Sequence, residues 1–196
     1  MASPSRPLLA LRLAALAIDG AVICGYAAVL FATTMAVYRT TAGGVPDLFS
    51  TVGVAGAHGL AFATLTAPVG LYLFGTEAVH QATVGKRIAG VAIASHTGRR
   101  AGVGAVAVRT IAKLAPWELA HWAVFRTVYH EEHLGHSPPG IVFAALCGAN
   151  ILLVAYVAVV LLTRGRRGPH DYLARTAVAR AAAPQARGTT CATGFD

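Results

Sequence analysis

The segment LLALRLAALAIDGAVICGYAAVLF (residues 8–31) opens an apolar run that continues to Val37 and holds two charged residues, Arg12 and Asp19. In a helix these residues are seven positions apart, so they share a face and lie about 10 Å apart along the axis. A carboxylate in the hydrocarbon core costs roughly 2.5 to 3.5 kcal/mol on insertion scales, and Asp19 lies too deep in the run to reach the headgroups. The segment therefore predicts a membrane helix in which the carboxylate of Asp19 either has a pairing partner or serves a function.

The composition of the whole chain favours one small membrane domain. Of its 196 residues, 56% are hydrophobic and 12% are charged, and the mean hydropathy is +0.60, whereas soluble domains carry about 25% charged residues. The net charge of +8 comes from residues that flank apolar segments, which favours a membrane and argues against nucleic acid as a partner. The three cysteines have neither metal-ligand nor disulfide spacing. An apolar run of about 30 residues after Arg6 is too long for a signal peptide, so we expect a retained helix.

Four membrane spans are expected, at approximately 10–37, 52–78, 104–128 and 140–163, within a domain of residues 8–180. The third is the least apolar because it contains several charged residues and Pro116. Fourteen of the sixteen Lys and Arg residues lie on one side of the predicted membrane: before or at the start of the first span, between the second span and the first part of the third, or after the fourth. Because positively charged flanks stay in the cytoplasm, the sequence predicts an all-α bundle in the bacterial plasma membrane with both termini cytoplasmic.

Two short β-prone pieces lie on the predicted cytoplasmic side. The first is within RIAGVAIASHTGRRAGVG (residues 87–104) and the second is TAVAR (residues 176–180). Both are too short and too polar to cross a membrane, so we expect a small cytoplasmic β-hairpin or sheet. Residues 181–196 have no apolar periodicity and are expected to be a disordered tail.

The same side gathers a set of motifs in a fixed order. They are Arg12 and Asp19, then Glu77, then TVGKR (residues 83–87), then GRRGPHDYLARTAVAR (residues 165–180). In this respect the chain resembles the RDD family of membrane proteins, named for an arginine at the start of the first helix, an aspartate within it and a second aspartate further on. The three named positions match Arg12, Asp19 and Asp171. Supporting matches are Glu77, Thr83, Gly85, Lys86, Arg87 and His170.

The resemblance implies a membrane protein for which transport of ions or small ligands is suggested, and the residues allow two interpretations. In the first, Asp19 accepts a proton or cation near the cytoplasmic leaflet, Arg12 is its electrostatic partner, and Asp171 positions or gates it. In the second, the three residues are a structural clasp in a non-catalytic scaffold or assembly partner. Because Arg12 is about two turns away, a nearer partner of Asp19 is expected from the basic stretch between Lys86 and Lys113.

Two further groups carry titratable side chains. Glu118 and His121 are spaced i, i+3 on the third span and could share a proton near the membrane core, although the neighbouring tryptophans also suit an interfacial anchor. The outer loop YHEEHLGHSPPG (residues 129–140) offers His130, His133 and His136 as candidate zinc ligands, but a solvated loop is the favoured interpretation. No metal or cofactor is therefore expected.

The remaining motifs argue against catalysis. Lys86 and Arg87 follow Gly85, but the phosphate-loop pattern is absent, so we expect them to contact lipid phosphates or a carboxylate. No arrangement of nucleophile and histidine can be placed in one pocket, and we expect the protein not to be an enzyme. The expected partners are the lipid bilayer, anionic headgroups at the cytoplasmic face and a second copy of the chain.

Overall fold

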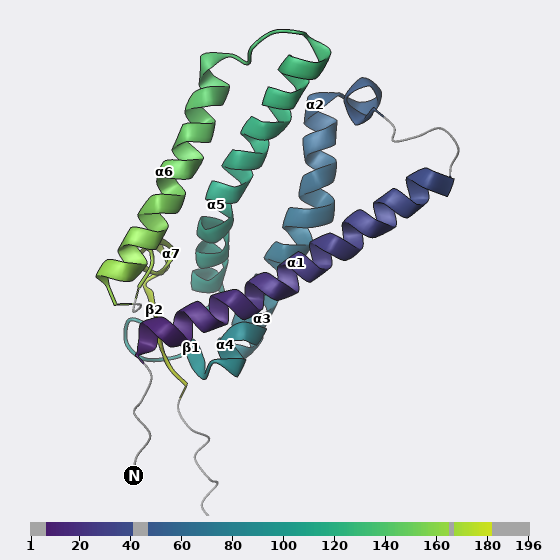
Figure 1. Cartoon of the computed structure of the whole chain (residues 1–196). Helices are drawn as coiled ribbons and strands as arrows, with labels where there is room; N and C mark the ends of the chain where they lie inside the picture. The colour runs from purple at the N-terminus through teal and green to yellow at the C-terminus, as the bar shows by residue number, and fades with distance from the viewer. Residues whose placement is uncertain (1–6, 41–46, 165–166, 182–196) are drawn as a thin grey trace, which may run out of the picture.

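A computed structural model describes residues 7–40, 47–164 and 167–181, which form long helices with a small sheet at one end (Figure 1). The predicted disordered tail lies, apart from Ala181, outside the described residues. The elements in chain order are α1 (Leu8–Thr40), α2 (Leu48–Ala61), η1 (Phe62–Thr66), α3 (Ala67–His80), α4 (Val84–Ile88), β1 (Val91–Ser95), α5 (Val103–Val128), η2 (Tyr129–His133), α6 (Gly140–Leu162), α7 (Pro169–Leu173) and β2 (Thr176–Arg180).

Three helical segments within the described residues are long and apolar enough to cross a membrane: Leu8–Thr40, Leu48–His80 and Gly140–Leu162. They coincide with three of the four expected spans and confirm an all-α membrane fold. Large apolar side chains such as Phe31 and Ile151 are mostly exposed on these helices, as contact with lipid requires.

The fourth expected span is the 26-residue helix α5, which is not among these three segments. The helix is about 39 Å long, so it is long enough to cross a membrane. Its charged residues, and not its length, exclude it from the segments that are apolar enough to do so. The cations Arg109 and Lys113 lower its hydropathy, yet both form ion pairs inside the bundle with Glu77 of α3. The polar residues of α5 therefore serve contacts between helices.

Gly53, with φ 69° and ψ 172°, kinks the first part of α2, and beyond this kink the segment runs into α3 as one helix interrupted by a π-helical turn, η1. A π-turn inserts one extra residue, and so it changes which side chains share a face before and after it. The hydroxyl of Tyr26 in α1 donates to the carbonyl oxygen of Thr64 in this turn at 2.5 Å. The turn is therefore a point of contact between α1 and the second span.

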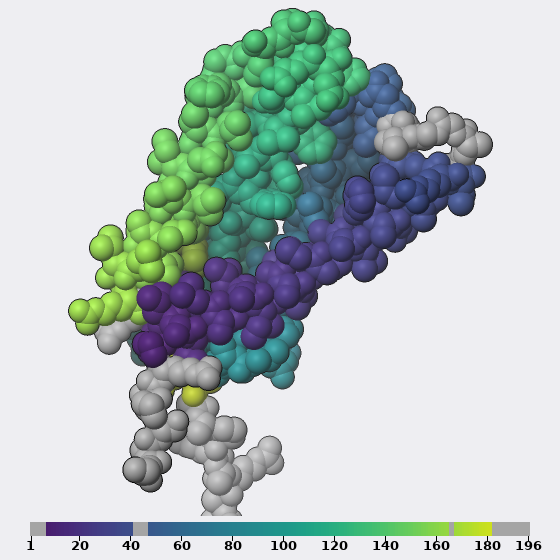
Figure 2. Space-filling model, in the orientation of Figure 1, coloured from purple at the N-terminus to yellow at the C-terminus, as the bar shows by residue number. Residues whose placement is uncertain are grey.

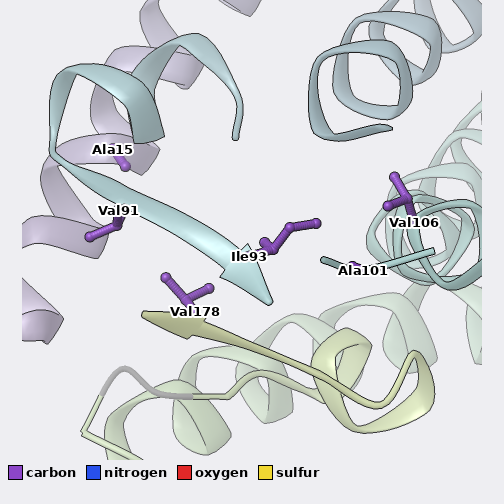
Figure 3. Close-up of a cluster of buried hydrophobic side chains, with 6 residues drawn as sticks. All are labelled: Ala15, Val91, Ile93, Ala101, Val106 and Val178. Carbon is purple, nitrogen blue, oxygen red and sulfur yellow. The ribbon is translucent and has the colours of Figure 1, made fainter. Parts of the chain in front are cut away.

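The end of the bundle that holds α4, β1, β2 and α7 is called the sheet end below. Strands β1 and β2 pair antiparallel, from Val91 opposite Arg180 to Ser95 opposite Thr176, which confirms the expected small sheet. The sheet joins segments that are far apart in the sequence, and it packs on α1 and α5. The buried apolar cluster at this end contains Ala15, Val91, Ile93, Ala101, Val106 and Val178 (Figure 3).

Helix α1 crosses the other long helices obliquely and packs chiefly against the short helix α4 (Figure 1). Gaps separate the middle of α1 from the helices behind it in the space-filling view (Figure 2). At the contact with α4, a Cβ atom added to Gly85 would lie 2.2 Å from the carbonyl oxygen of Ala15 and 2.9 Å from Cγ of Asp19. The two helices can therefore approach this closely only because residue 85 has no side chain.

We expect Gly85→Ala to destabilise the fold by about 1 to 3 kcal/mol, because the added methyl group forces α4 away from α1. The measurement is the free energy of unfolding of the purified protein in detergent. Gly75→Ala is the matched control, since a Cβ there meets no heavy atom of the described residues within 4 Å. Equal losses in the two variants would show that the contact between α1 and α4 is not the cause.

Candidate functional site

Glu77 is a completely buried carboxylate in the last turn of α3, and three cations surround it. Lys113 Nζ donates to Oε1 at 2.7 Å, and Arg109 Nε donates to Oε2 at 3.0 Å. Lys86 Nζ of α4 also donates to Oε1. Because Arg109 and Lys113 are spaced i, i+4 on α5, both point at the same carboxylate. Three helices thus meet at one buried negative charge.

Asp171 is the second completely buried carboxylate, and it lies in the short helix α7. It accepts from the backbone amide of Gly168 at 2.7 Å, which caps the start of α7. Arg12 Nη2 donates to its Oδ2 at 2.8 Å, and Thr176 Oγ1 of β2 donates to Oδ1 at 3.2 Å. Arg109 Nη1 forms an ion pair with Oδ1. The carboxylate therefore ties the last segments of the described chain to α1 and α5.

Arg109 connects the two carboxylates. Its side chain is 1% exposed, its Nε contacts Glu77, and its Nη1 contacts Asp171 and Thr176, the latter at 3.1 Å. We refer to Arg12, Glu77, Lys86, Arg109, Lys113 and Asp171 as the ion-pair network. A buried charge is tolerated only when it is paired and its hydrogen bonds are made, and this guanidinium meets both conditions.

Asp19 has different surroundings. Its side chain accepts hydrogen bonds from three neutral groups: Tyr72 Oη at 2.7 Å, Thr83 Oγ1 at 2.5 Å and the amide of Gly85 at 2.8 Å. Asp19 is 7% exposed. Thr83 also caps α4 by accepting from the amide of Lys86. The TxGKR element thus supplies a hydroxyl and an amide to Asp19 and a cation to the ion-pair network.

Two expected partnerships of Asp19 are wrong. Arg12 forms its ion pair with Asp171, because a shared helix face does not bring side chains two turns apart into contact. The basic stretch from Lys86 to Lys113 was expected to approach Asp19, but its buried cations engage Glu77. The three residues of the Arg/Asp/Asp motif consequently belong to two adjoining sites.

His170 lies beside the ion-pair network and is 7% exposed. Its Nε2 is 3.2 Å from Nη2 of Arg12 and 3.4 Å from Oδ2 of Asp171, and its ring stacks on Tyr156 at 5.7 Å. Burial, and then the nearby cations with Arg109 first among them, holds the pKa of His170 well below its ordinary value. The imidazole is therefore neutral at physiological pH and accepts a hydrogen bond from Arg12.

The two basic residues of the TxGKR element have different environments. Burial lowers the pKa of Lys86 to about 8, although the carboxylate of Glu77 acts in the opposite direction. This leaves Lys86 largely charged at neutral pH. Arg87 is exposed at the surface of the sheet end, so a contact between Arg87 and lipid phosphate stays a prediction.

Glu118 and His121 do lie together, with Nδ1 of His121 3.5 Å from Oε1 of Glu118. The sequence did not indicate the other two members of this group. His58 Nε2 of α2 lies 3.4 Å from Oε2 of Glu118, and Thr66 Oγ1 of η1 donates to Oε1 at 2.5 Å. We refer to these four residues as the Glu118 cluster.

The histidines of the predicted outer loop are partly helical, since His130 and His133 belong to η2. His133 Nε2 lies 3.3 Å from Asp47, and its ring stacks on Tyr129 at 5.6 Å. His130 and His136 each have Nδ1 on a backbone carbonyl oxygen. Across residues 7–40, 47–164 and 167–181, no group of three or more His, Cys, Asp or Glu residues is arranged to hold a metal ion.

A cavity of about 810 Å³ lies at the sheet end beside β2. Its lining includes Leu8 of α1, Tyr172 of α7 and the β2 residues 177–180. Asp19 does not line this cavity or the smaller one beside it, which borders Leu162 and Arg164. In this conformation, Asp19 is closed off from both.

Sequence reasoning missed the roles of Arg109, Lys113, Tyr72 and Thr176. One signal was available. Arg109 and Lys113 are spaced i, i+4 in the first half of the third span, and Glu77 is the single charged residue of the second span. Complementary charges in two membrane segments are expected to meet. Tyr72 and Thr176 give no such signal, because neutral hydroxyl groups are common in helices and strands.

We expect Glu77→Gln to lower the free energy of unfolding by about 3 to 5 kcal/mol, because it leaves three buried cations around a neutral side chain. The measurement is unfolding in detergent at neutral pH. Glu131→Gln makes the same chemical change at an exposed position and should have almost no effect. A loss below about 1 kcal/mol for Glu77→Gln would contradict the ion-pair network.

The lowered pKa of His170 predicts a dependence of stability on pH. The neutral imidazole stabilises the fold above about pH 6.5, its unfolded value, and this contribution is lost as the pH falls below that value. We expect the thermal midpoint of the wild type to fall between pH 7 and pH 5, and to fall less in His170→Gln. His96→Gln, at an exposed turn, should retain the wild-type slope. Parallel curves for wild type and His170→Gln would refute this assignment.

Comparison with known proteins agrees with the motif pattern. A family model described as the RDD family matches residues 6–175, a range that includes Arg12, Asp19 and Asp171. Searches of curated proteins and of solved structures found no match. The family match covers most of the chain and confirms the resemblance seen in the sequence. The chain therefore belongs to the RDD family.

Proposed function

We propose that this protein is an ion-coupled membrane transporter in which Asp19 binds the transported proton or small cation. One observation carries the proposal. Among the buried carboxylates of the described residues, Glu77 and Asp171 are engaged by cations, whereas Asp19 accepts its hydrogen bonds from neutral groups. Its negative charge is the one that an exchangeable cation can neutralise.

The atoms around Asp19 suit this exchange. The carboxylate oxygens, the hydroxyl oxygens of Tyr72 and Thr83, and the nearby carbonyl oxygen of Ala15 are hard ligands of the kind that small cations prefer. A hydroxyl group can also turn from donating to accepting when the carboxylate takes up a proton. Both changes require little movement of the backbone.

Neither cavity at the sheet end is lined by Asp19 in this conformation, so transport by way of either cavity requires a change in access to Asp19. Helix α1 carries Asp19 and packs chiefly against the short helix α4. A shift of α1 against α4 would break the hydrogen bonds from Thr83 and Gly85 together. We place the gating movement at this contact.

The proposed setting is the bacterial plasma membrane, with the sheet end and both termini in the cytoplasm. The distribution of Lys and Arg along the sequence supports this orientation. Exposed arginines at the sheet end would contact anionic lipid headgroups, at about 1 kcal/mol each. They are Arg87, Arg99, Arg100, Arg164, Arg175 and Arg180. In this setting the protein would transport an ion and would not act as an enzyme.

A second candidate function is that of a membrane scaffold or assembly partner, which could act as a homo-oligomer. The observation that favours it is the ion-pair network, in which Arg12, Arg109 and Asp171 fasten α1, α5 and α7 together. The network is fully engaged and would perform the same structural task in a transporter. The two functions therefore differ at Asp19 and not at Asp171.

The test is proton and cation movement in liposomes that contain the purified protein and an internal pH dye. We expect the wild type to move protons when Na⁺ or K⁺ is added outside, and Asp19→Asn to lose at least 90% of this rate while it keeps its fold. Asp47→Asn, an exposed cap of α2, is the control and should transport normally.

The contrary outcome is equally clear. If the wild type moves neither proton nor cation, and Asp19→Asn merely unfolds at a lower temperature, the transport proposal is wrong and the scaffold remains.

A further inference from the structure

The Glu118 cluster is a separate group of titratable side chains in the membrane region. His58 Nε2 faces Oε2 of Glu118 at 3.4 Å, and His121 Nδ1 faces Oε1 at 3.5 Å. Thr66 Oγ1 donates to Oε1. Two imidazoles thus approach the two oxygens of a single carboxylate, and they come from different helices, α2 and α5.

The cluster is distinct from the ion-pair network and from Asp19. Along α5, Glu118 lies five residues beyond Lys113, which corresponds to about 7.5 Å of helix rise. His58 and Thr66 belong to the apolar segment Leu48–His80 that is long enough to span the membrane. Ionisable groups at this depth are costly and mark ion or proton pathways.

The two imidazole nitrogens that face Glu118 are incompletely satisfied. His58 Nε2 and His121 Nδ1 are both buried without a hydrogen-bond partner among the described residues, although each is close to a carboxylate oxygen. A lone pair on either nitrogen would repel the carboxylate, whereas a proton there would be attracted to it. The geometry thus provides two positions for a proton beside one negative charge.

The π-turn η1 explains how His58 and Thr66 reach the same carboxylate. Residues eight positions apart in a regular α-helix are rotated by about 80° from one another. Because a π-turn inserts one residue, the pair behaves as if it were seven positions apart, within about 20° of one face. The irregularity of the helix therefore places both side chains on Glu118.

Aromatic rings surround the cluster and limit its contact with other polar groups. The ring of Trp117 lies 4.4 Å from that of His121, and the ring of Phe125 lies 5.6 Å from that of His58. Apolar surroundings strengthen the attraction between an imidazolium and a carboxylate. Among the described residues, the titratable side chains that form ion pairs with Glu118 are His58 and His121.

We propose that Glu118, His58 and His121 form a second proton-binding site, which holds a shared proton between α2 and α5. The proton lies on one of the two facing nitrogens and can pass between the histidines by way of Glu118. Uptake of the proton draws the two helices together, and its release weakens their contact. This site goes beyond the proposed transport at Asp19 and does not depend on it.

The test is histidine NMR of the full chain in lipid nanodiscs, titrated with acid and assigned with His58→Gln and His121→Gln. We expect Glu118→Gln to lower the proton affinity of both histidines about tenfold, which is a shift of about one pH unit. Removal of either histidine should change the affinity of the other at least threefold. Glu131→Gln, an exposed control, should change neither.

The proposal is overturned if each histidine titrates independently of Glu118 and of the other histidine. Thr66→Val serves as a second variant should Glu118→Gln fail to fold, because loss of the donated hydrogen bond must also alter both titrations. Asp19→Asn separates this inference from the transport proposal. Asp19→Asn should leave the histidine titrations unchanged even if it abolishes transport. If the wild type does not transport at all, the NMR titrations still test the shared proton of the Glu118 cluster.

Discussion

The structure depends on the placement of one guanidinium, that of Arg109, between two buried carboxylates. Glu77 arrives from α3 and Asp171 from α7, and neither could remain ionised in apolar surroundings alone. Because Arg109 contacts both, the orientation of α5 is fixed against α3 and the sheet end at once. The other cations of the network then pair with these two carboxylates: Lys86 and Lys113 with Glu77, and Arg12 with Asp171.

The charged residues of the chain fall into groups with different physical character. The ion-pair network has its carboxylates fully engaged by cations, as a permanent fastening requires. Asp19 is held by hydroxyl groups and an amide, so its charge is stabilised by hydrogen bonds that can be exchanged. The Glu118 cluster combines one acid with two weak bases, a composition suited to moving a proton. One small bundle thus keeps carboxylates paired with cations apart from carboxylates that face hydroxyl groups or histidines.

Much of this fold follows from the sequence, whereas the pairing of side chains does not. Apolar length predicted the helices, and the two β-prone pieces predicted the sheet. The partner of Arg12 could not be derived in this way, because a heptad spacing reports a shared face and not which neighbouring helix that face meets. The approach of both His58 and Thr66 to Glu118 depends on the π-turn, and no residue in FATLT (residues 62–66) predicts such a turn. Crossing angles and helix irregularities decide these contacts, and both are properties of the assembled bundle.

The order of the chain gives the network a consequence for biosynthesis. Arg12 and Arg109 are synthesised before the segment that carries Asp171, since translation proceeds from the N-terminus. During that interval Glu77 is the sole completed acid of the network among the described residues, and it faces an excess of cations. Helix α7 and strand β2, the last elements of the described residues, therefore complete both the sheet and the ion-pair network. A chain that ends before residue 171 lacks the carboxylate that Arg12 and Arg109 contact in the finished bundle.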